Sequence, residues 1–181
     1  GEKRLNYELF PSKEGRRYKS LLLRNGGQYY LGIPLIKDAV LQEMADVTPL
    51  TYQAYNPCVA YLNGEYWGLY NMRERNNKDN LYSNYGYKSD EFDLIDNDWS
   101  PRVSEGNMEE YKKMQEYIES EDLTTDGAYE QVCRMIDIDN YLYYMAIEIL
   151  LKNDDWPENN QKLFRPKTTD GKWRWILQDL D

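Results

Sequence analysis

The chain has 181 residues, 41% of them hydrophobic, so it can bury one substantial core and predicts about one domain. Its 32 acidic and 22 basic residues give a net charge of -10, which argues against broad contact with a nucleic-acid backbone, because such contact needs clustered Lys and Arg. Histidine is absent, which excludes Ser-His and Cys-His nucleophile pairs and leaves carboxylates or Lys for catalysis.

Cysteine usage and hydropathy exclude two further classes of protein. Cys58 and Cys133 each stand in an apolar run, so we expect buried free thiols, and the sequence predicts no zinc site. No apolar run approaches the roughly 20 residues of a membrane-spanning helix. The chain starts and stops abruptly and shows no signal peptide at Gly1, so we expect it to be truncated at both ends.

The first half of the chain predicts strands around one helix. Residues 19–24 are typical of a buried strand, ended by Asn-Gly-Gly at 25–27. From Pro34 to the Thr-Pro pair at 48–49 the spacing predicts an amphipathic helix of roughly three turns. Its expected apolar face consists of Leu35, Ile36, Ala39, Val40 and Met44.

Asn63-Gly64 lies between two apolar runs and predicts a β-hairpin with a type I′ turn, because both residues tolerate positive φ. The polar stretch 76–101 gives no clear elements. Helical periodicity over 108–118, 128–136 and 142–150 predicts three successive helices. We expect N-caps at Ser104, Asp126 and Asp137.

Residues 161–165 and 172–178 predict two short strands around a turn at 168–171. Strands therefore come first, helices follow and a hairpin ends the chain. This order predicts an α+β fold, with a small sheet-rich lobe up to Glu74, a helical lobe after it and a cleft between them.

Acidic and amide side chains concentrate in two places. The loop 153–160 follows the strongest predicted helix, whose negative end disfavours Asp154 and Asp155 unless a cation or donor lies nearby. Asp179 and Asp181 end the last predicted strand, where alternation would point both carboxylates to one side. Such oxygens suit Mg²⁺ bound to phosphates, although spacing alone favours solvated loop ends over a metal site.

The spacing from Asp155 to Asn160 matches the catalytic loop of protein kinases. In that loop an Asp accepts the proton of the substrate hydroxyl, and an Asn five positions later holds Mg²⁺. The match is weak alone. It becomes informative because a hairpin and an acidic segment follow, as the metal-binding Asp of a kinase follows its catalytic loop.

Five blocks of the sequence carry a more specific signal. They are Leu-Arg-Asn-Gly-Gly at 23–27, Tyr-Leu-Asn-Gly-Glu-Tyr-Trp-Gly-Leu-Tyr-Asn-Met-Arg-Glu at 61–74, Ile-Asp-Ile-Asp-Asn-Tyr at 136–141, Asp-Trp-Pro-Glu-Asn-Asn at 155–160 and Trp-Arg-Trp-Ile-Leu-Gln-Asp-Leu-Asp at 173–181. Together they resemble the CotH (spore coat protein H) family of atypical protein kinases over nearly the whole chain. The resemblance implies a divergent, partial, two-lobe kinase-like fold, with 1–74 in the N-lobe and 75–181 in the C-lobe.

The same resemblance implies transfer of the γ-phosphoryl group of ATP to protein Ser or Thr, with Mg²⁺ or Mn²⁺ as the metal. It implies that Asp155 is the catalytic Asp, that Asn160 binds metal and nucleotide, and that Asp181 is the metal-binding Asp that opens the activation segment. Asp179 is a second candidate metal ligand.

Two pairs of charged residues have less defined roles. Arg73 and Glu74 would lie near the lobe junction, where nucleotide contact and a structural salt bridge are equally expected. Asp38 and Glu43 lie on the first predicted helix, where they could position a nucleotide-binding Lys, but we favour pairing with bases at the surface.

The resemblance places the protein in the spore coat or on a bacterial cell surface, with a coat or surface protein as acceptor. The family's phosphate-covering strand pair and its Lys-Lys segment are absent from this chain, so we expect weak or absent ATP binding and little activity by the fragment alone. Two alternatives remain: a non-catalytic coat-assembly or binding module, and a metal-dependent hydrolase that uses the same carboxylates.

Overall fold

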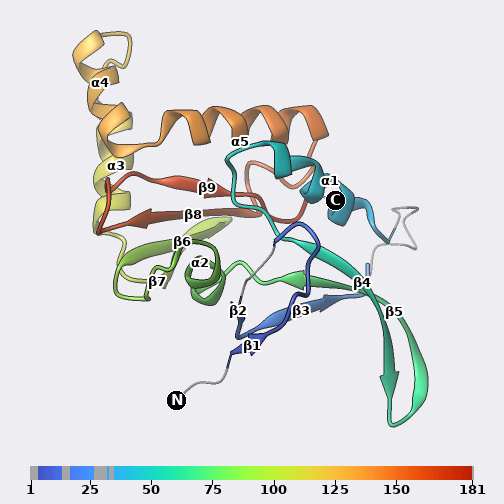
Figure 1. Ribbon diagram of the computed structural model, residues 1–181. Coiled ribbons are helices and arrows are strands. Elements are labelled where there is room, and N and C mark those ends of the chain that lie inside the picture. The colour runs from blue at the N-terminus through green and yellow to red at the C-terminus, as the bar shows by residue number, and fades with distance from the viewer. Residues whose placement is uncertain (1–3, 14–16, 27–31, 33–34, 181) are drawn as a thin grey trace. The chain divides into compact units, whose positions relative to one another are not determined.

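The computed structural model describes residues 4–13, 17–26, 32 and 35–180, which fall into two compact units (Figure 1). One unit contains the described residues of 1–86 and 177–181, and the other contains 87–176. The described residues form five α-helices and three small sheets, which confirms a fold of mixed helices and strands. The two-lobe kinase-like arrangement and its division after Glu74 stay predictions.

The first unit is built on a three-stranded antiparallel sheet. Its strand order is β3 (Leu21–Arg24), β5 (Glu65–Glu74), β4 (Tyr55–Leu62). The hairpin turn has positive φ at Asn63 (51°) and Gly64 (85°), so the predicted turn is confirmed. A two-stranded sheet pairs β1 (Leu5–Asn6) with β2 (Arg17–Tyr18).

Helix α1 (Lys37–Met44), with the short 3₁₀ helix η2 (Ala45–Val47) after it, buries a different face from the one expected. Val40 and Met44 are 46% and 62% exposed, whereas Asp38 and Gln42 are buried. The expected apolar face is therefore wrong except at Ala39, which is buried, and the expected surface position of Asp38 is wrong too. The reason is electrostatic, because two arginines pair with the Asp38 carboxylate. The expected start of the helix at Pro34 lies outside the described residues.

Helix α2 (Lys78–Tyr85) lies in the stretch that gave no clear elements. The Asn77 side chain accepts from the backbone N–H groups of Asp79 (3.0 Å) and Asn80 (3.2 Å), which caps the helix start. Gly86, at φ 78°, ends it in the left-handed conformation. The two capping residues mark where the helix begins and ends. Its residues are mostly polar, so the sequence shows no apolar periodicity that would predict it.

The second unit packs three helices with a four-stranded antiparallel sheet. The strand order is β7 (Ser100–Glu105), β6 (Phe92–Asp98), β8 (Gln161–Pro166), β9 (Arg174–Ile176). The helices are α3 (Glu109–Ser120), α4 (Asp126–Met135) and α5 (Ile138–Leu151). The three predicted helices and the final hairpin are confirmed. No helix in the described part of the chain is long and apolar enough to span a bilayer.

Only one of the three predicted caps is confirmed. The Asp137 side chain accepts from the Asn140 N–H at 3.1 Å and caps α5. Helix α4 is instead capped by Thr125, one residue before the expected Asp126, and Ser104 lies in strand β7. The difference at α4 is one residue, within the usual uncertainty of helix ends, whereas Ser104 lies four residues before Met108, the N-cap position of α3.

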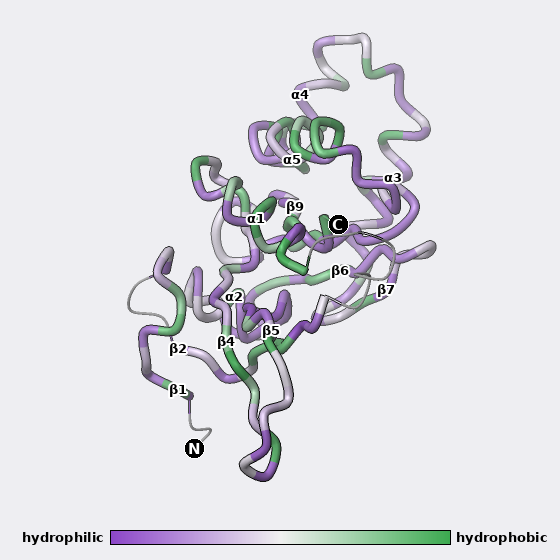
Figure 2. Tube along the Cα trace, turned by 90° about the vertical axis from the view of Figure 1, so that its right-hand side faces the viewer, coloured by the Kyte–Doolittle hydropathy of each residue, from purple (hydrophilic) through white to green (hydrophobic). Residues whose placement is uncertain are grey.

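Helix α5 is fastened to the sheet by polar groups. The Trp175 N–H donates to Asn140 Oδ1 at 2.7 Å, and Asn140 Nδ2 returns a bond to the Trp175 carbonyl at 3.3 Å. The buried residues of α5 are Asn140, Tyr144 and Glu148, whereas Leu142, Ile149 and Leu150 are exposed although much of the helix is hydrophobic (Figure 2). The helix therefore directs a carboxylate toward the interior of this unit.

Candidate functional site

The loop that follows α5 carries the first of the predicted site residues. The helix ends at Leu151, and Lys152 adopts the left-handed conformation at φ 51°. Within the loop, Asn160 Nδ2 lies 3.5 Å from Asp155 Oδ2, and the Asp155 carbonyl accepts from the Asn159 N–H at 2.9 Å. The structure therefore brings the carboxylate of Asp155 and the amide of Asn160 together in one turn of chain.

Both sides of this loop are held within the second unit. The Trp99 N–H, at the turn between β6 and β7, donates to the Glu158 carbonyl at 2.8 Å. The ring of Trp156 packs edge-on against Tyr144 of α5, with ring centroids 6.5 Å apart. Asn160 sits at φ 59°, a conformation that Asn tolerates better than most residues. The exposed side chain of Asp155 is thus presented from a braced loop.

The oxygens of this loop have the chemistry that a magnesium–phosphate complex requires. A carboxylate can accept a proton or bind a cation, and an amide oxygen is a hard ligand suited to Mg²⁺. Over residues 4–13, 17–26, 32 and 35–180, no group of three or more Asp, Glu, Cys or His side chains is arranged to hold a metal. The described residues can therefore provide part of a coordination shell, which phosphate and water oxygens would complete.

Asp179 lies in the first unit and takes part in an ion pair. Its carboxylate pairs with Arg24, which also donates to Asp38 Oδ2 at 2.9 Å. Strand β9 ends at Ile176, and Asp179 has φ 52°, so the expected strand alternation is wrong at this position. Asp181 lies outside the described residues.

The segment around Asp179 is anchored on both sides. The Leu177 N–H donates to the Thr51 carbonyl at 2.9 Å, and the Leu177 carbonyl accepts from Asn76 Nδ2 at 3.0 Å. The Leu180 N–H donates to Asp38 Oδ1 at 2.9 Å. Leu177 and Leu180 are fully buried, so Asp179 is held between two fixed points.

Arg73 and Glu74 both form buried ion pairs in the first unit. The Arg73 guanidinium donates to the Asp38 carboxylate, and the Lys13 ammonium donates to Glu74 Oε2. Glu74 also accepts from the Ala54 N–H at 3.2 Å. This geometry supports the salt-bridge interpretation of both residues, and nucleotide contact stays a prediction.

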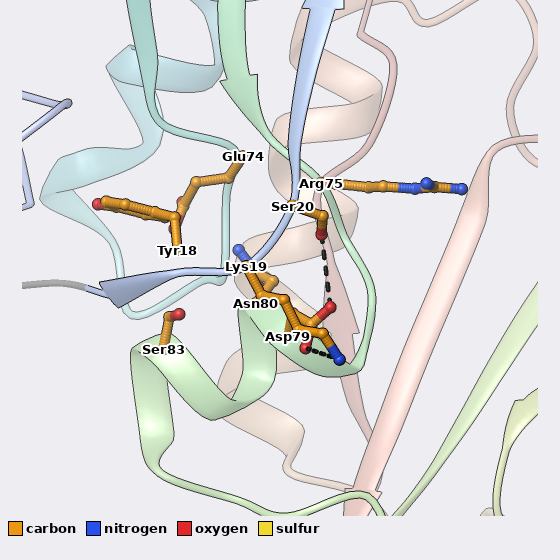
Figure 3. Close-up of a pocket in the computed structure, with 8 residues that line it drawn as sticks. All are labelled: Tyr18, Lys19, Ser20, Glu74, Arg75, Asp79, Asn80 and Ser83. Atoms are coloured by element: carbon orange, nitrogen blue, oxygen red, sulfur yellow. Dashed lines mark hydrogen bonds and ion pairs between the residues drawn. The ribbon is translucent and has the colours of Figure 1, made fainter. Parts of the chain in front are cut away.

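Two hollows lie in the first unit. Figure 3 shows the smaller, about 10 Å³, between the β2–β3 region and α2, with the Ser20 hydroxyl 3.5 Å from Asp79 Oδ2 and Arg75 pointing away. The wider one, about 220 Å³, is lined by Lys13 and Tyr52 among others. Both volumes are below the roughly 300 Å³ typical of small-molecule sites. Neither hollow contains Asp155 or Asn160.

Sequence reasoning missed Asn153 and Glu148, which support the loop. Asn153 Nδ2 donates to Glu148 Oε2 at 3.0 Å, and Asn153 Oδ1 accepts from the Asp155 N–H at 3.3 Å. The only available signal was the spacing of Glu148 from Tyr144, which places both on one helix face. The opposite face of the helix carries more apolar residues, so the periodicity predicts that the opposite face is the buried one.

Comparison with protein families identifies a match over most of the chain. The family model described as CotH kinase protein matches residues 7–181. No curated protein matches the chain.

Proposed function

Because the chain belongs to the CotH kinase family, we propose that it transfers the γ-phosphoryl group of ATP to Ser or Thr residues of a protein. Family membership gives kinase-type chemistry and the use of a nucleotide and a metal in general. The acceptor residue and the individual roles below are proposals, as is the divergent two-lobe kinase fold.

The proposal rests on the contact between Asp155 and Asn160. Asp155 is exposed and carries its carboxylate 3.5 Å from the Asn160 amide, five residues later in the same loop. A kinase needs a carboxylate that accepts the proton of the acceptor hydroxyl and a neighbouring oxygen that holds metal. We assign the first role to Asp155 and the second to Asn160. This chemistry needs no histidine, which agrees with the composition.

Asp179, which lies in the first unit, and Asp181 are the other proposed metal ligands. When bound, Mg²⁺ or Mn²⁺ would neutralise charge on the nucleotide phosphates. Asp181 has the role of the Asp that opens a kinase activation segment, and Asp179 is the second candidate. The Arg24 ion pair already compensates the charge of Asp179, which supports Asp181 as the main metal ligand of the two.

A coat or cell-surface protein is the proposed acceptor, because the family takes its name from a spore coat protein. The compartment that follows is the spore coat or the bacterial cell surface. The acceptor would supply a Ser or Thr hydroxyl to the exposed carboxylate of Asp155.

The test is phosphate incorporation from γ-labelled ATP with Mg²⁺ by the full-length protein, with that protein and casein as acceptors. Asp155→Ala should abolish incorporation, whereas Glu158→Gln, an exposed acid of the same loop, should leave it within twofold. Equal incorporation by wild type and Asp155→Ala would overturn the assignment. ATP turnover that needs no protein acceptor would favour a metal-dependent hydrolase.

One observation favours a second function, a non-catalytic coat-assembly or surface-binding module. Tyr61, Tyr66 and Trp67 are each more than 60% exposed around the β4–β5 hairpin. Exposed aromatic rings are typical of binding surfaces. Calorimetry separates the two functions, because a binding module would show no Mg²⁺-dependent heat with ATP.

A further inference from the structure

Helix α5 carries a buried acid that the proposed chemistry does not use. Glu148 is 1% exposed and lies one turn before the C-terminal end of the helix. The negative end of a helix disfavours a carboxylate, and burial disfavours its charged form. Burial raises the pKa of Glu148 to about 7, and the hydrogen bond from Asn153 and the neighbouring Tyr144 hydroxyl limit the rise. An acid held at such a cost is expected to have a specific task.

The carboxylate is connected to the loop of Asp155 through one residue. Asn153 donates from Nδ2 to Glu148 Oε2 at 3.0 Å and accepts at Oδ1 from the Asp155 N–H at 3.3 Å. The Asn153 carbonyl also accepts from the Trp156 N–H at 3.3 Å. Because Asn153 is buried, its amide has one orientation that serves both neighbours, with the donor toward Glu148 and the acceptor toward Asp155.

Tyr144 adds a second connection between the same helix and the same loop. Its ring packs edge-on against Trp156, the residue after Asp155. Burial and the neighbouring Glu148 carboxylate raise the pKa of the Tyr144 hydroxyl, so it stays protonated near neutral pH. The helix face formed by Tyr144 and Glu148 therefore contacts the loop on both sides of Asp155.

We propose that Glu148 is a positioning residue, which fixes the orientation of Asn153 and thereby holds the Asp155 backbone in place. This inference rests on the proposed role of Asp155 as the residue that accepts the hydroxyl proton. Phosphoryl transfer depends chiefly on positioning, so a displaced Asp155 should lower kcat more than it raises the KM for ATP.

A donor–acceptor swap tests the proposal. Asn153→Asp places a second carboxylate against Glu148, and the two repel unless they share a proton. Glu148→Gln with Asn153→Asp reverses the bond, because the Gln amide then donates to the Asp carboxylate while that carboxylate still accepts from the Asp155 N–H. At pH 8 we expect Asn153→Asp to lower kcat at least tenfold, and the double variant to recover most of it.

Three further variants serve as comparisons for this test. Asn153→Ala should lower kcat at least tenfold with the KM for ATP changed less than threefold. Glu148→Gln alone should stay within threefold of wild type, because its amide oxygen can still accept from Asn153. Asp139→Asn, at an exposed acid of the same helix, is the matched control and should behave as wild type. A double variant no more active than Asn153→Asp would overturn the proposal.

Amide hydrogen exchange gives a readout that needs no kinase activity. In Asn153→Ala the Asp155 and Trp156 amides should exchange at least tenfold faster, with those of α3 unchanged, and the swap should restore protection. Unchanged exchange at these amides would overturn the positioning role even in an active kinase. Faster exchange in a protein that transfers no phosphate would support the positioning of the loop while the proposed function fails.

Discussion

The guanidinium of Arg73 on β5 and the carboxylate of Asp38 on α1 form an ion pair that is almost fully withdrawn from solvent, at 1% and 4% exposure. Asp38 also accepts from Arg24 at 2.9 Å and from the Leu180 N–H at 2.9 Å. A buried charge pair is costly to form but far more costly to break, because the remaining partner is left charged and uncompensated. Asp38 is therefore the centre of the polar core of the first unit.

Removing that centre should destabilise the protein strongly. We expect Asp38→Ala to lower the free energy of unfolding by about 3 to 5 kcal/mol, because Arg73 would lose its buried counter-charge. Glu65→Gln, at an exposed acid in β5, is the control and should stay within about 0.5 kcal/mol. Urea titration followed by fluorescence measures both. A loss below about 1 kcal/mol for Asp38→Ala would contradict the account.

Gly106 should resist substitution by any residue with a side chain. A Cβ atom there would lie 2.2 Å from Asp93 Oδ1 and 2.8 Å from the Phe92 carbonyl, at φ 76°. Asp93 is buried and pairs with Arg165 at 2.8 Å and Lys167 at 3.0 Å, so it cannot move freely. Gly106→Ala should cost about 2 kcal/mol or more, read as a lower thermal midpoint.

Gly127 is the matched position for that measurement. It lies in helix α4, where an added Cβ meets nothing within 4 Å. Gly127→Ala should be neutral or should stabilise the protein by up to about 1 kcal/mol, because Ala favours the helix. Equal melting temperatures for the two Ala variants would contradict the packing described around Asp93.

Glu148 should make the protein less stable as pH rises. Its pKa is about 7 in the folded protein, against an ordinary value of 4.5. Between these values the folded state holds a proton that the unfolded state has released, so stability falls as pH rises through this range and levels off above it. Over the whole range the free energy of unfolding falls by about 3 kcal/mol. Glu148→Gln should therefore gain stability relative to wild type between pH 5 and pH 8, measured by urea unfolding at both.

Asn160 should determine how much metal the proposed reaction requires. Asn160→Gly removes the amide while it suits the left-handed backbone at φ 59°. We expect the Mg²⁺ concentration for half-maximal phosphate transfer to rise at least tenfold, because one oxygen ligand is lost. Asn160→Asp, which keeps an oxygen at that position, should show a smaller change. An unaltered Mg²⁺ requirement in Asn160→Gly would remove Asn160 from the proposed metal ligands.

Local signals predicted much of the fold. The Asn63-Gly64 turn and the Asp137 cap depend on residues close in sequence, and both are confirmed. The buried faces of α1 and α5 were not predicted, because burial depends on partners far along the chain. Asp38 is buried because it pairs with Arg73, which lies 35 residues away in the sequence, and no periodicity predicts such a pair.

The candidate site likewise contains residues that local spacing predicts and residues whose role depends on burial. Asp155 and Asn160 share one loop, so their spacing alone predicted that they would lie together. Glu148 and Asn153 were missed, because an acid on an apolar helix gains its role only when burial orients it toward the loop. Alternation predicts Asp179 at the end of the last strand, but β9 ends three residues earlier at Ile176, and Asp179 itself adopts the left-handed conformation.

The anchoring of residues 177–180 has a consequence for synthesis on the ribosome. Leu177 and Leu180 belong to the core of the first unit, yet they are made after the whole of the second unit, residues 87–176. The second unit is one continuous stretch and can fold as soon as it emerges, whereas the first must wait with an incomplete core. We therefore expect the part of the protein made first to be the last to finish folding.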